Sequence, residues 1–132
     1  MTKEIEFLKT RAKEFFERAK EDFEKQRFNL AVLDIEQAVQ LWIKHLIFIK
    51  ARDFPKTHYF DVLLKELSRV YNNKKIEEFY KNHILEFKIL EEAYITTRYL
   101  PKDFNKDESI KIIKFSKMFF KFLGKVLNEK FI

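Results

Sequence analysis

The sequence predicts an all-α protein, a five-helix up-and-down bundle, and three observations support this. Apolar residues recur at spacings of three and four along most of the 132 residues, which is the pattern of helices with one buried face. The chain holds one glycine and two prolines, so few residues interrupt the helices. The breaks between the periodic segments are short, which favours neighbouring helices packed side by side. We therefore expect residues 1–132 to form a single domain.

The first expected helix is about six turns long, and the segment KQRFN at residues 25–29 interrupts it. The second, over residues 28–50, is apolar on nearly every side, so we expect it to lie at the centre of the bundle. Pro55 forces Phe54 out of helical geometry and separates this helix from the next. The apolar stripe of the first helix consists of Ile5, Leu8, Ala12, Phe15, Ala19 and Phe23.

A short third helix is expected over residues 58–71, with Thr57 as its N-cap. The fourth, over residues 75–97, keeps apolar residues at helical spacing as far as Tyr94. It ends before Pro101, the second proline of the chain. The two helices together account for the middle of the sequence.

The last helix is expected over residues 109–131, with Asp107 or Ser109 as its N-cap. Its outer face is basic, and no acidic residue interrupts that face between Ile110 and Asn128. Such a face attracts RNA phosphates, but it is also an ordinary way to solvate a helix. Its apolar stripe consists of Ile112, Phe115, Phe119, Phe122 and Val126, and its basic face consists of Lys111, Lys114, Lys117, Lys121 and Lys125.

Composition excludes several classes of protein. With 46% apolar and 36% charged residues and a net charge of +6, the chain is that of a globular protein. No apolar run is long enough to cross a membrane and the first residues are charged, so we expect a cytoplasmic protein that does not bind membranes. The chain has no cysteine, no glycine-rich phosphate loop and no HExxH motif, and we expect neither a metal nor a cofactor. Lysine greatly outnumbers arginine, as in heat-adapted proteins.

The stretch EEAYITTRYLPKDF, residues 91–104, is the strongest candidate for a ligand site. Arg98 supplies a forked phosphate donor, Tyr99 a ring for stacking, and Pro101 a rigid turn, which together suit a nucleotide. The alternative is structural: Arg98 caps carbonyl groups at the end of the fourth helix, and Pro101 stops that helix.

Three histidines are spread over the chain. We expect packing or surface roles for His45 and His83, because each lies in a helix without a partner motif. His58 follows Thr57 at the start of the third helix, where a neutral imidazole can fix the turn.

The order of three stretches resembles that of a HEPN domain. The resemblance runs through FNLAVLDIEQAVQLWIKHLIF (28–48), FPKTHYFDVLLKEL (54–67) and AYITTRYLP (93–101) and covers nearly the whole chain. This family has a QA-rich helix, a Pro-x-Thr-His turn, a Leu-Leu helix, a tyrosine and an Arg-Tyr-Pro turn. The matching residues are Gln37-Ala38, Pro55-Lys56-Thr57-His58, Leu63-Leu64, Tyr94 and Arg98-Tyr99, with Leu100 inserted before Pro101.

The resemblance implies a bundle of about five helices, often a homodimer, and often encoded with a minimal nucleotidyltransferase as a toxin–antitoxin or defence-related pair. Catalytic members are metal-independent ribonucleases in which a histidine follows the arginine after four to six residues. After Arg98, positions 103–105 are Asp, Phe and Asn, and no histidine follows. The resemblance therefore favours a protein that binds a nucleotide, RNA or a nucleotidyltransferase without catalysis, through Arg98, Tyr99 and the lysines Lys111, Lys114, Lys117 and Lys121.

Two alternatives stay open at this point. The first is a divergent ribonuclease in which folding or a dimer partner brings His58 or His83 close to Arg98. The second is a purely structural dimerisation module, which the sixteen phenylalanines of the chain favour because one protomer cannot easily cover so many.

Overall fold

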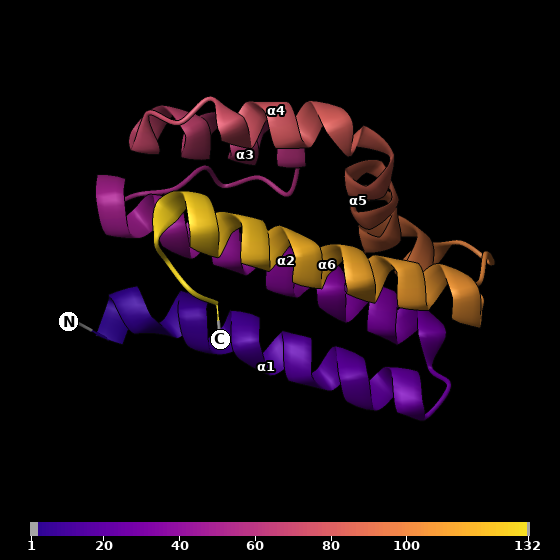
Figure 1. The fold of residues 1–132 in the computed structure, drawn as a ribbon. Coiled ribbons are helices and arrows are strands. Elements are labelled where there is room, and N and C mark those ends of the chain that lie inside the picture. Colours follow the sequence, from indigo (N-terminus) through magenta and orange to yellow (C-terminus); the bar gives the residue numbers. More distant parts are fainter. Residues whose placement is uncertain (1–2, 132) are drawn as a thin grey trace.

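Six helices form the computed structural model, which describes residues 3–131, with side chains from Glu6 onward (Figure 1). The prediction of an all-α fold is confirmed, whereas the prediction of five helices is wrong because the expected fourth helix is divided in two. The helices are α1 (Lys3–Glu24), α2 (Phe28–Ala51), α3 (Phe60–Tyr71), α4 (Lys75–Asn82), α5 (Ile84–Tyr99) and α6 (Lys106–Leu127).

Helix α2 lies at the centre, in contact with α1, α3, α5 and α6, as its sequence predicts. Trp42, Ile43 and Leu46 are completely buried, and burying each such side chain stabilises the fold by roughly 1.5–3 kcal/mol. Figure 1 shows α1 running antiparallel to α2 and α6 running alongside them. Within residues 3–131, none of the helices is both long and apolar enough to cross a bilayer.

The apolar stripe of α1 packs on α2 largely as predicted. Leu8, Ala12 and Ala19 are buried, but Phe16 is also buried while Phe15 is only partly covered. The stripe is therefore wider than a single line of residues. The side chain of Ile5 lies outside the part of the chain whose side chains are described.

His83 divides the expected fourth helix into α4 and α5. Its backbone leaves helical geometry, with φ −133° and ψ 30°, and its N–H bonds to the carbonyl of Tyr80 at 3.1 Å. The imidazole packs on the ring of Phe79 at 4.3 Å and faces Phe115 of α6 at 5.5 Å. Apolar residues continue at helical spacing through this residue, so the sequence pattern contains no signal of the bend.

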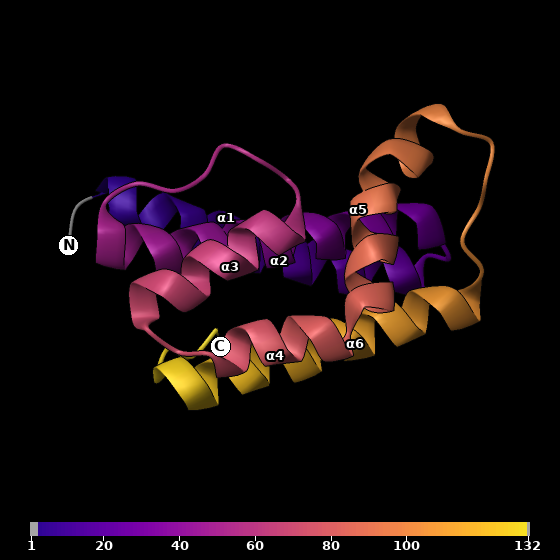
Figure 2. The ribbon, with the colours of Figure 1, turned by 90° about the horizontal axis from the view of Figure 1, so that it is seen from above.

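The bend changes the topology from a simple up-and-down bundle. Figure 2 shows α4 lying along α6, while α5 turns away from both of them and runs steeply toward the side of α1 and α2, where it packs on α2. The loop that follows brings the chain back to the start of α6. The C-terminal end of α5, which carries Arg98, therefore projects away from α6.

Thr57 is not the N-cap of α3. The cap residue is Tyr59, which gives no side-chain cap, and the Thr57 hydroxyl accepts a bond from the backbone N–H of Tyr59 at 3.2 Å. The carboxylate of Glu91 in α5 takes the place of a local cap by accepting a hydrogen bond from the backbone N–H of Phe60 at 2.8 Å. A negative charge at this position also suits the positive end of the helix.

The predicted caps of the last helix, Asp107 and Ser109, are also wrong. Asn105 caps α6 by accepting from the N–H of Glu108 at 2.8 Å, and the Glu108 carboxylate accepts from the N–H of Asn105 at 3.0 Å. This reciprocal pair is a capping box. Ser109 is buried one turn further on and donates to the carbonyl of Phe28 at 3.2 Å.

The last helix ends earlier than predicted, at Leu127, because Asn128 adopts a left-handed conformation. The chain then turns back toward α1 (Figure 1). Phe131 is 3% exposed and packs on Phe120, Phe16 and Trp42, with ring centroids 3.9, 5.5 and 5.1 Å apart. The segment after α6 is thus part of the core rather than a helical extension.

Candidate functional site

The last turns of α5 carry Tyr94 and Arg98, one helical turn apart. Arg98 Nε donates to the carbonyl of Tyr94 at 2.9 Å, and the guanidinium carbon lies 4.0 Å from the centroid of the Tyr94 ring. The ring of Tyr99 is 5.4 Å from the same guanidinium. The structural alternative for Arg98 is therefore present in part, since it does cap a carbonyl. The side chain is nevertheless exposed.

His58 joins this group from the turn before α3. Its ring stacks on the ring of Tyr94, with centroids 4.6 Å apart and planes 12° apart, and lies 4.3 Å from the ring of Tyr59. The fold therefore brings Arg98 and His58 to the same tyrosine ring. We refer to His58, Tyr94, Arg98 and Tyr99 as the Arg98 cluster.

Helix α5 holds the turn before α3 at two points. Glu91 and Tyr94 lie about one turn apart on α5, the first holding the N–H of Phe60 and the second stacking on His58. Lys88 Nζ lies 3.3 Å from the second carboxylate oxygen of Glu91. The turn before α3 is thus held by a carboxylate and a ring from one helix.

A row of polar side chains on α2 lies buried in the same region, and the sequence reasoning missed it. The carboxylate of Glu36 accepts from Gln40 Nε2 at 2.6 Å, and Lys44 Nζ donates to Gln40 Oε1 at 2.8 Å. Burial raises the pKa of Glu36 to about 7, although Gln37, Gln40, Lys44 and Arg98 lower it. Burial also lowers the pKa of Lys44. Polar residues at every fourth position of an apolar helix are the signal that predicts such a row.

The loop between α5 and α6 covers the positions where the family's ribonucleases carry a histidine. Asp103 accepts from Asn29 Nδ2 at 2.7 Å, and the N–H of Phe104 donates to Asn29 Oδ1 at 2.6 Å. Phe104 is buried and Asn105 caps α6. All three positions therefore have structural roles.

The structure divides the predicted basic face of α6 into two parts. Lys111 and Lys114 line a cavity of about 700 Å³ between α5 and α6, together with Glu86, Glu92 and Glu108. Glu86 and Glu92 of α5 thus reach this half of the face, which the sequence of α6 alone does not reveal. Lys117 and Lys121 line a different cavity, between α6 and α1.

The other two histidines are part of the packing. His45 is buried and stacks on Trp42 with centroids 5.1 Å apart. His83 forms the bend between α4 and α5, with Nδ1 3.4 Å from a carboxylate oxygen of Glu86. The structure therefore places His58, and not His83, beside Arg98. Within residues 3–131 there is no group of three His, Asp or Glu side chains arranged to hold a metal ion.

A bundle of helices whose penultimate helix ends with Arg98 and Tyr99 is consistent with the architecture that the HEPN resemblance implies. A family model of the HEPN domain matches residues 5–127. The chain therefore belongs to the HEPN domain family. Neither a curated protein nor a solved structure matches it.

Proposed function

We propose that this HEPN domain binds single-stranded RNA or a nucleotide at the Arg98 cluster without cleaving it. The observation that carries the proposal is the exposed guanidinium of Arg98, held 4.0 Å above the Tyr94 ring by a bond to the Tyr94 carbonyl. Only Nε is used in that bond. Because the side chain is exposed, its terminal nitrogens can reach a phosphate and donate to it.

The neighbouring rings suit the base of the same ligand. Tyr99 is 70% exposed and lies beside the guanidinium. Stacking on an aromatic side chain contributes roughly 1–3 kcal/mol per base and tolerates every base. An arginine for phosphate and a ring for the base therefore form one recognition unit for an unpaired nucleotide.

The absence of catalysis is proposed from the loop after Arg98. A ribonuclease of this type needs a group that shuttles the 2′-hydroxyl proton near neutral pH. Positions 103–105 supply none, because Asp103 and Phe104 are bound to Asn29 and Asn105 caps α6.

A divergent ribonuclease is the second candidate, and one observation favours it. His58 and Arg98 contact the same ring, that of Tyr94, so an imidazole and a guanidinium lie close enough to act on one phosphodiester. Against it, His58 is partly buried and stacks on two tyrosines, which restricts its movement toward a substrate.

We also propose a homodimer, with a minimal nucleotidyltransferase as a second partner. Beside Arg98, the side chains of Ile95, Tyr99 and Leu100 are exposed, and exposed apolar groups of this kind gather at protein interfaces. If this surface only joins two protomers, the domain is a structural dimerisation module and RNA will not bind. We also propose that the protein is cytoplasmic. Its net charge of +6 suits a polyanionic ligand.

The decisive experiment incubates wild type and Arg98→Ala protein with mixed-sequence single-stranded RNA in the absence of metal, scoring cleavage and retention together. We expect retention without cleavage, and at least about tenfold weaker binding by Arg98→Ala, the cost of one charge-assisted hydrogen bond. Unfolding free energy should change by less than about 1 kcal/mol, because the side chain is exposed. A larger loss of stability would show that Arg98 is structural.

Arg11→Ala is the matched control, because Arg11 also lies over an aromatic ring, that of Phe7, at 5.0 Å but on α1. It should bind RNA like the wild type. Cleavage that disappears in both Arg98→Ala and His58→Ala would establish the ribonuclease instead. Binding equal in all variants would rule out the Arg98 cluster as the RNA site.

A further inference from the structure

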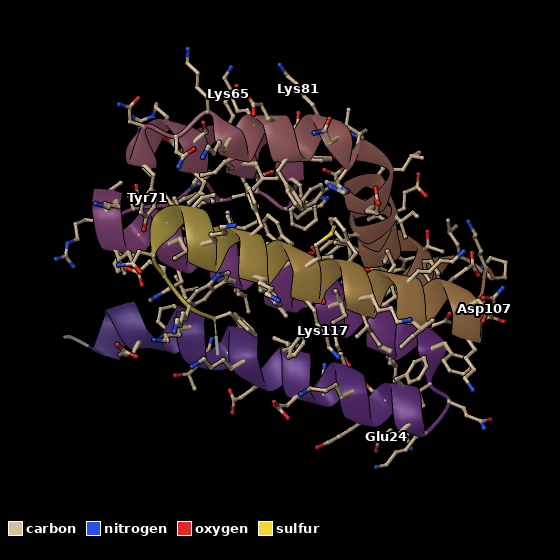
Figure 3. The ribbon with its side chains drawn as sticks, in the orientation of Figure 1. Glu24, Lys65, Tyr71, Lys81, Asp107 and Lys117 are labelled. Carbon is tan, nitrogen blue, oxygen red and sulfur yellow. The ribbon has the colours of Figure 1, made fainter. Side chains whose placement is uncertain are left out.

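A second cavity, of about 570 Å³, lies between α1, α6 and the segment after α6. It falls within the range of 300–1,000 Å³ that is usual for small-molecule sites. Figure 1 shows the chain after α6 turning back toward α1, and Lys130 and Phe131 of that segment line the cavity. Figure 3 places Lys117 on the side of α6 that faces α1.

Five lysines from three segments surround this cavity, and no carboxylate lines it. One comes from α1, three from α6 and one from the segment after α6. Among them, only Lys20 has an ion pair in residues 3–131, a 3.4 Å contact with the exposed Glu17 on its own helix. Five ammonium groups around one space repel each other unless an anion lies between them. The lysines are Lys20, Lys117, Lys121, Lys125 and Lys130.

The floor of the cavity is aromatic and rigid. Phe16, Phe120 and Phe131 line it, and the rings of Phe120 and Phe131 stack at 3.9 Å. Each of the three side chains is 5% exposed or less, because most of its surface packs inside the core. The floor therefore offers little ring surface to a base and no apolar group that can enter a lipid bilayer.

We propose that this cavity binds a polyphosphate group, recognised by its charge rather than by a base. A triphosphate carries about four negative charges near neutral pH, close to the charge of the five lysines. The lysines approach from three segments and enclose the ligand, whereas an RNA strand is bound by cations in a row along an open groove. The phosphate chain is the feature shared by inorganic polyphosphates and nucleoside triphosphates.

The polyphosphate cavity is separate from the Arg98 cluster. The cavity is lined by α1, the second half of α6 and the segment that follows it. The Arg98 cluster belongs to the end of α5 and the turn before α3. The two sites share no residue, so each can be tested while the other stays intact.

The test measures binding of sodium tripolyphosphate, ATP and orthophosphate to the full chain by calorimetry at about 0.15 M salt, where surface charges beyond roughly 8 Å are screened. We expect saturable binding of tripolyphosphate and ATP with similar affinity, and orthophosphate at least about tenfold weaker because it makes fewer contacts. Much tighter binding of ATP than of tripolyphosphate that persists in the Arg98→Ala protein would show that the cavity recognises the base, and it would overturn recognition by charge; a preference for ATP that disappears in Arg98→Ala would belong to the Arg98 cluster.

Lys121→Glu/Lys125→Glu is the decisive variant, with Lys65→Glu/Lys81→Glu as its control of equal charge. Figure 3 shows Lys65 and Lys81 at the top of the view on α3 and α4, away from Lys117, and neither of them lines the cavity. Reversal at the cavity should weaken tripolyphosphate binding at least about a hundredfold, whereas the control should change it less than about threefold. Lys121→Gln/Lys125→Gln should give an intermediate loss.

Two further results would overturn the proposal. One is the absence of saturable binding of either polyphosphate to the wild type at 0.15 M salt. The other is an equal loss in both charge-reversed variants, which would assign the binding to net charge alone. A circular dichroism melt of each variant confirms that it is folded, and bound tripolyphosphate should raise the melting temperature of wild type but not of the cavity variant.

Discussion

Asp34, Glu36 and Glu91 are buried carboxylates, and each is compensated in a different way. Arg18 of α1 donates to Asp34 Oδ1 through Nε at 3.1 Å and Nη2 at 2.8 Å. Glu36 receives hydrogen bonds from two glutamine amides, and Glu91 from a backbone N–H and a lysine. A buried charge without such partners costs several kcal/mol. These residues are therefore the polar groups on which the packing of α2 depends most.

Burial and the nearby carboxylate of Asp22 raise the pKa of Asp34 from its ordinary value of 3.8 to about 7, although Arg18 lowers it. Folded Asp34 thus keeps its proton between pH 4 and 7 while unfolded Asp34 loses it. The folded state binds more protons in this window, so stability falls as pH rises from about 4 to about 7.

Asp34→Asn should remove this part of the pH dependence, because the amide cannot ionise and still offers an oxygen to Arg18. Between pH 4 and 7, the wild type should lose on the order of 2–4 kcal/mol of unfolding free energy relative to the variant. Urea unfolding at several pH values measures the difference. Asp53→Asn, the same change at an exposed side chain, should run parallel to the wild type; a parallel line for Asp34→Asn would mean that Asp34 titrates normally.

Glu91→Ala should destabilise the fold by about 1–3 kcal/mol, because the N–H of buried Phe60 loses its acceptor. Glu91→Gln should cost less, since the amide oxygen can still accept that bond. Chemical denaturation ranks the three proteins. Equal stability of the alanine and glutamine variants would show that the charge, and not the hydrogen bond, holds the start of α3.

Single residues of the candidate site differ in how far the sequence predicts them. Arg98 and Tyr99 stand out because they are adjacent at a helix end, and Glu36 and Gln40 could have been found from their spacing on α2. The contact of Asn29 with the loop at residues 103–104 could not, because its partners lie more than seventy positions away in the chain. Local patterns carry no information on such a pair.

At the scale of elements, helix positions follow from apolar periodicity, whereas several helix ends do not. Without glycine at any turn, four of the six helices are followed by a non-glycine residue in the left-handed conformation. These residues are Gln26, Arg52, Asn72 and Asn128, with φ between 49° and 62°. Asparagine adopts the left-handed conformation readily, whereas in arginine and glutamine the Cβ atom clashes with the backbone and raises the energy. The end of α2 at Arg52 is accordingly strained.

Arg52→Gly should stabilise the protein by about 0.5–1 kcal/mol, because glycine adopts positive φ without steric cost. The backbone N–H of residue 52 keeps its 2.8 Å bond to the carbonyl of Phe48, so the cap itself is preserved. Thermal denaturation of the variant and the wild type measures the change in stability. Lys50→Gly, inside the last turn of α2, is the comparison and should lose about 1 kcal/mol; a loss in both variants would show that the left-handed residue is not strained.

At the scale of the whole molecule, the all-α class and the central position of α2 follow from the sequence, but the crosswise path of α5 does not. The apolar register runs unbroken through His83, and at the bend its ring packs on Phe79 of α4 and Phe115 of α6, which are contacts that the register does not predict. The Arg98 cluster depends on that path, since α5 must cross the bundle for Tyr94 to meet His58. The sequence therefore predicts residues of the site, but not which of them contact each other.

The bend at His83 also makes domain exchange available to this fold. If residues 75–99 formed one straight helix, α5 and α6 would leave their own protomer and could pack in the same way on a second copy. Short hinges of this kind often decide between a closed monomer and an exchanged dimer, because the two forms share nearly all contacts.

His83→Ala should favour the exchanged form, because alanine has the highest helix propensity and no ring to pack on Phe79. Size-exclusion chromatography with light scattering should show a dimer that does not dissociate on dilution and converts only after unfolding, in contrast to an ordinary surface dimer. Asn82→Ala, next to the bend but on an exposed residue, should elute like the wild type. The side chain of His83 would then determine whether α5 and α6 pack on their own protomer or on a second copy.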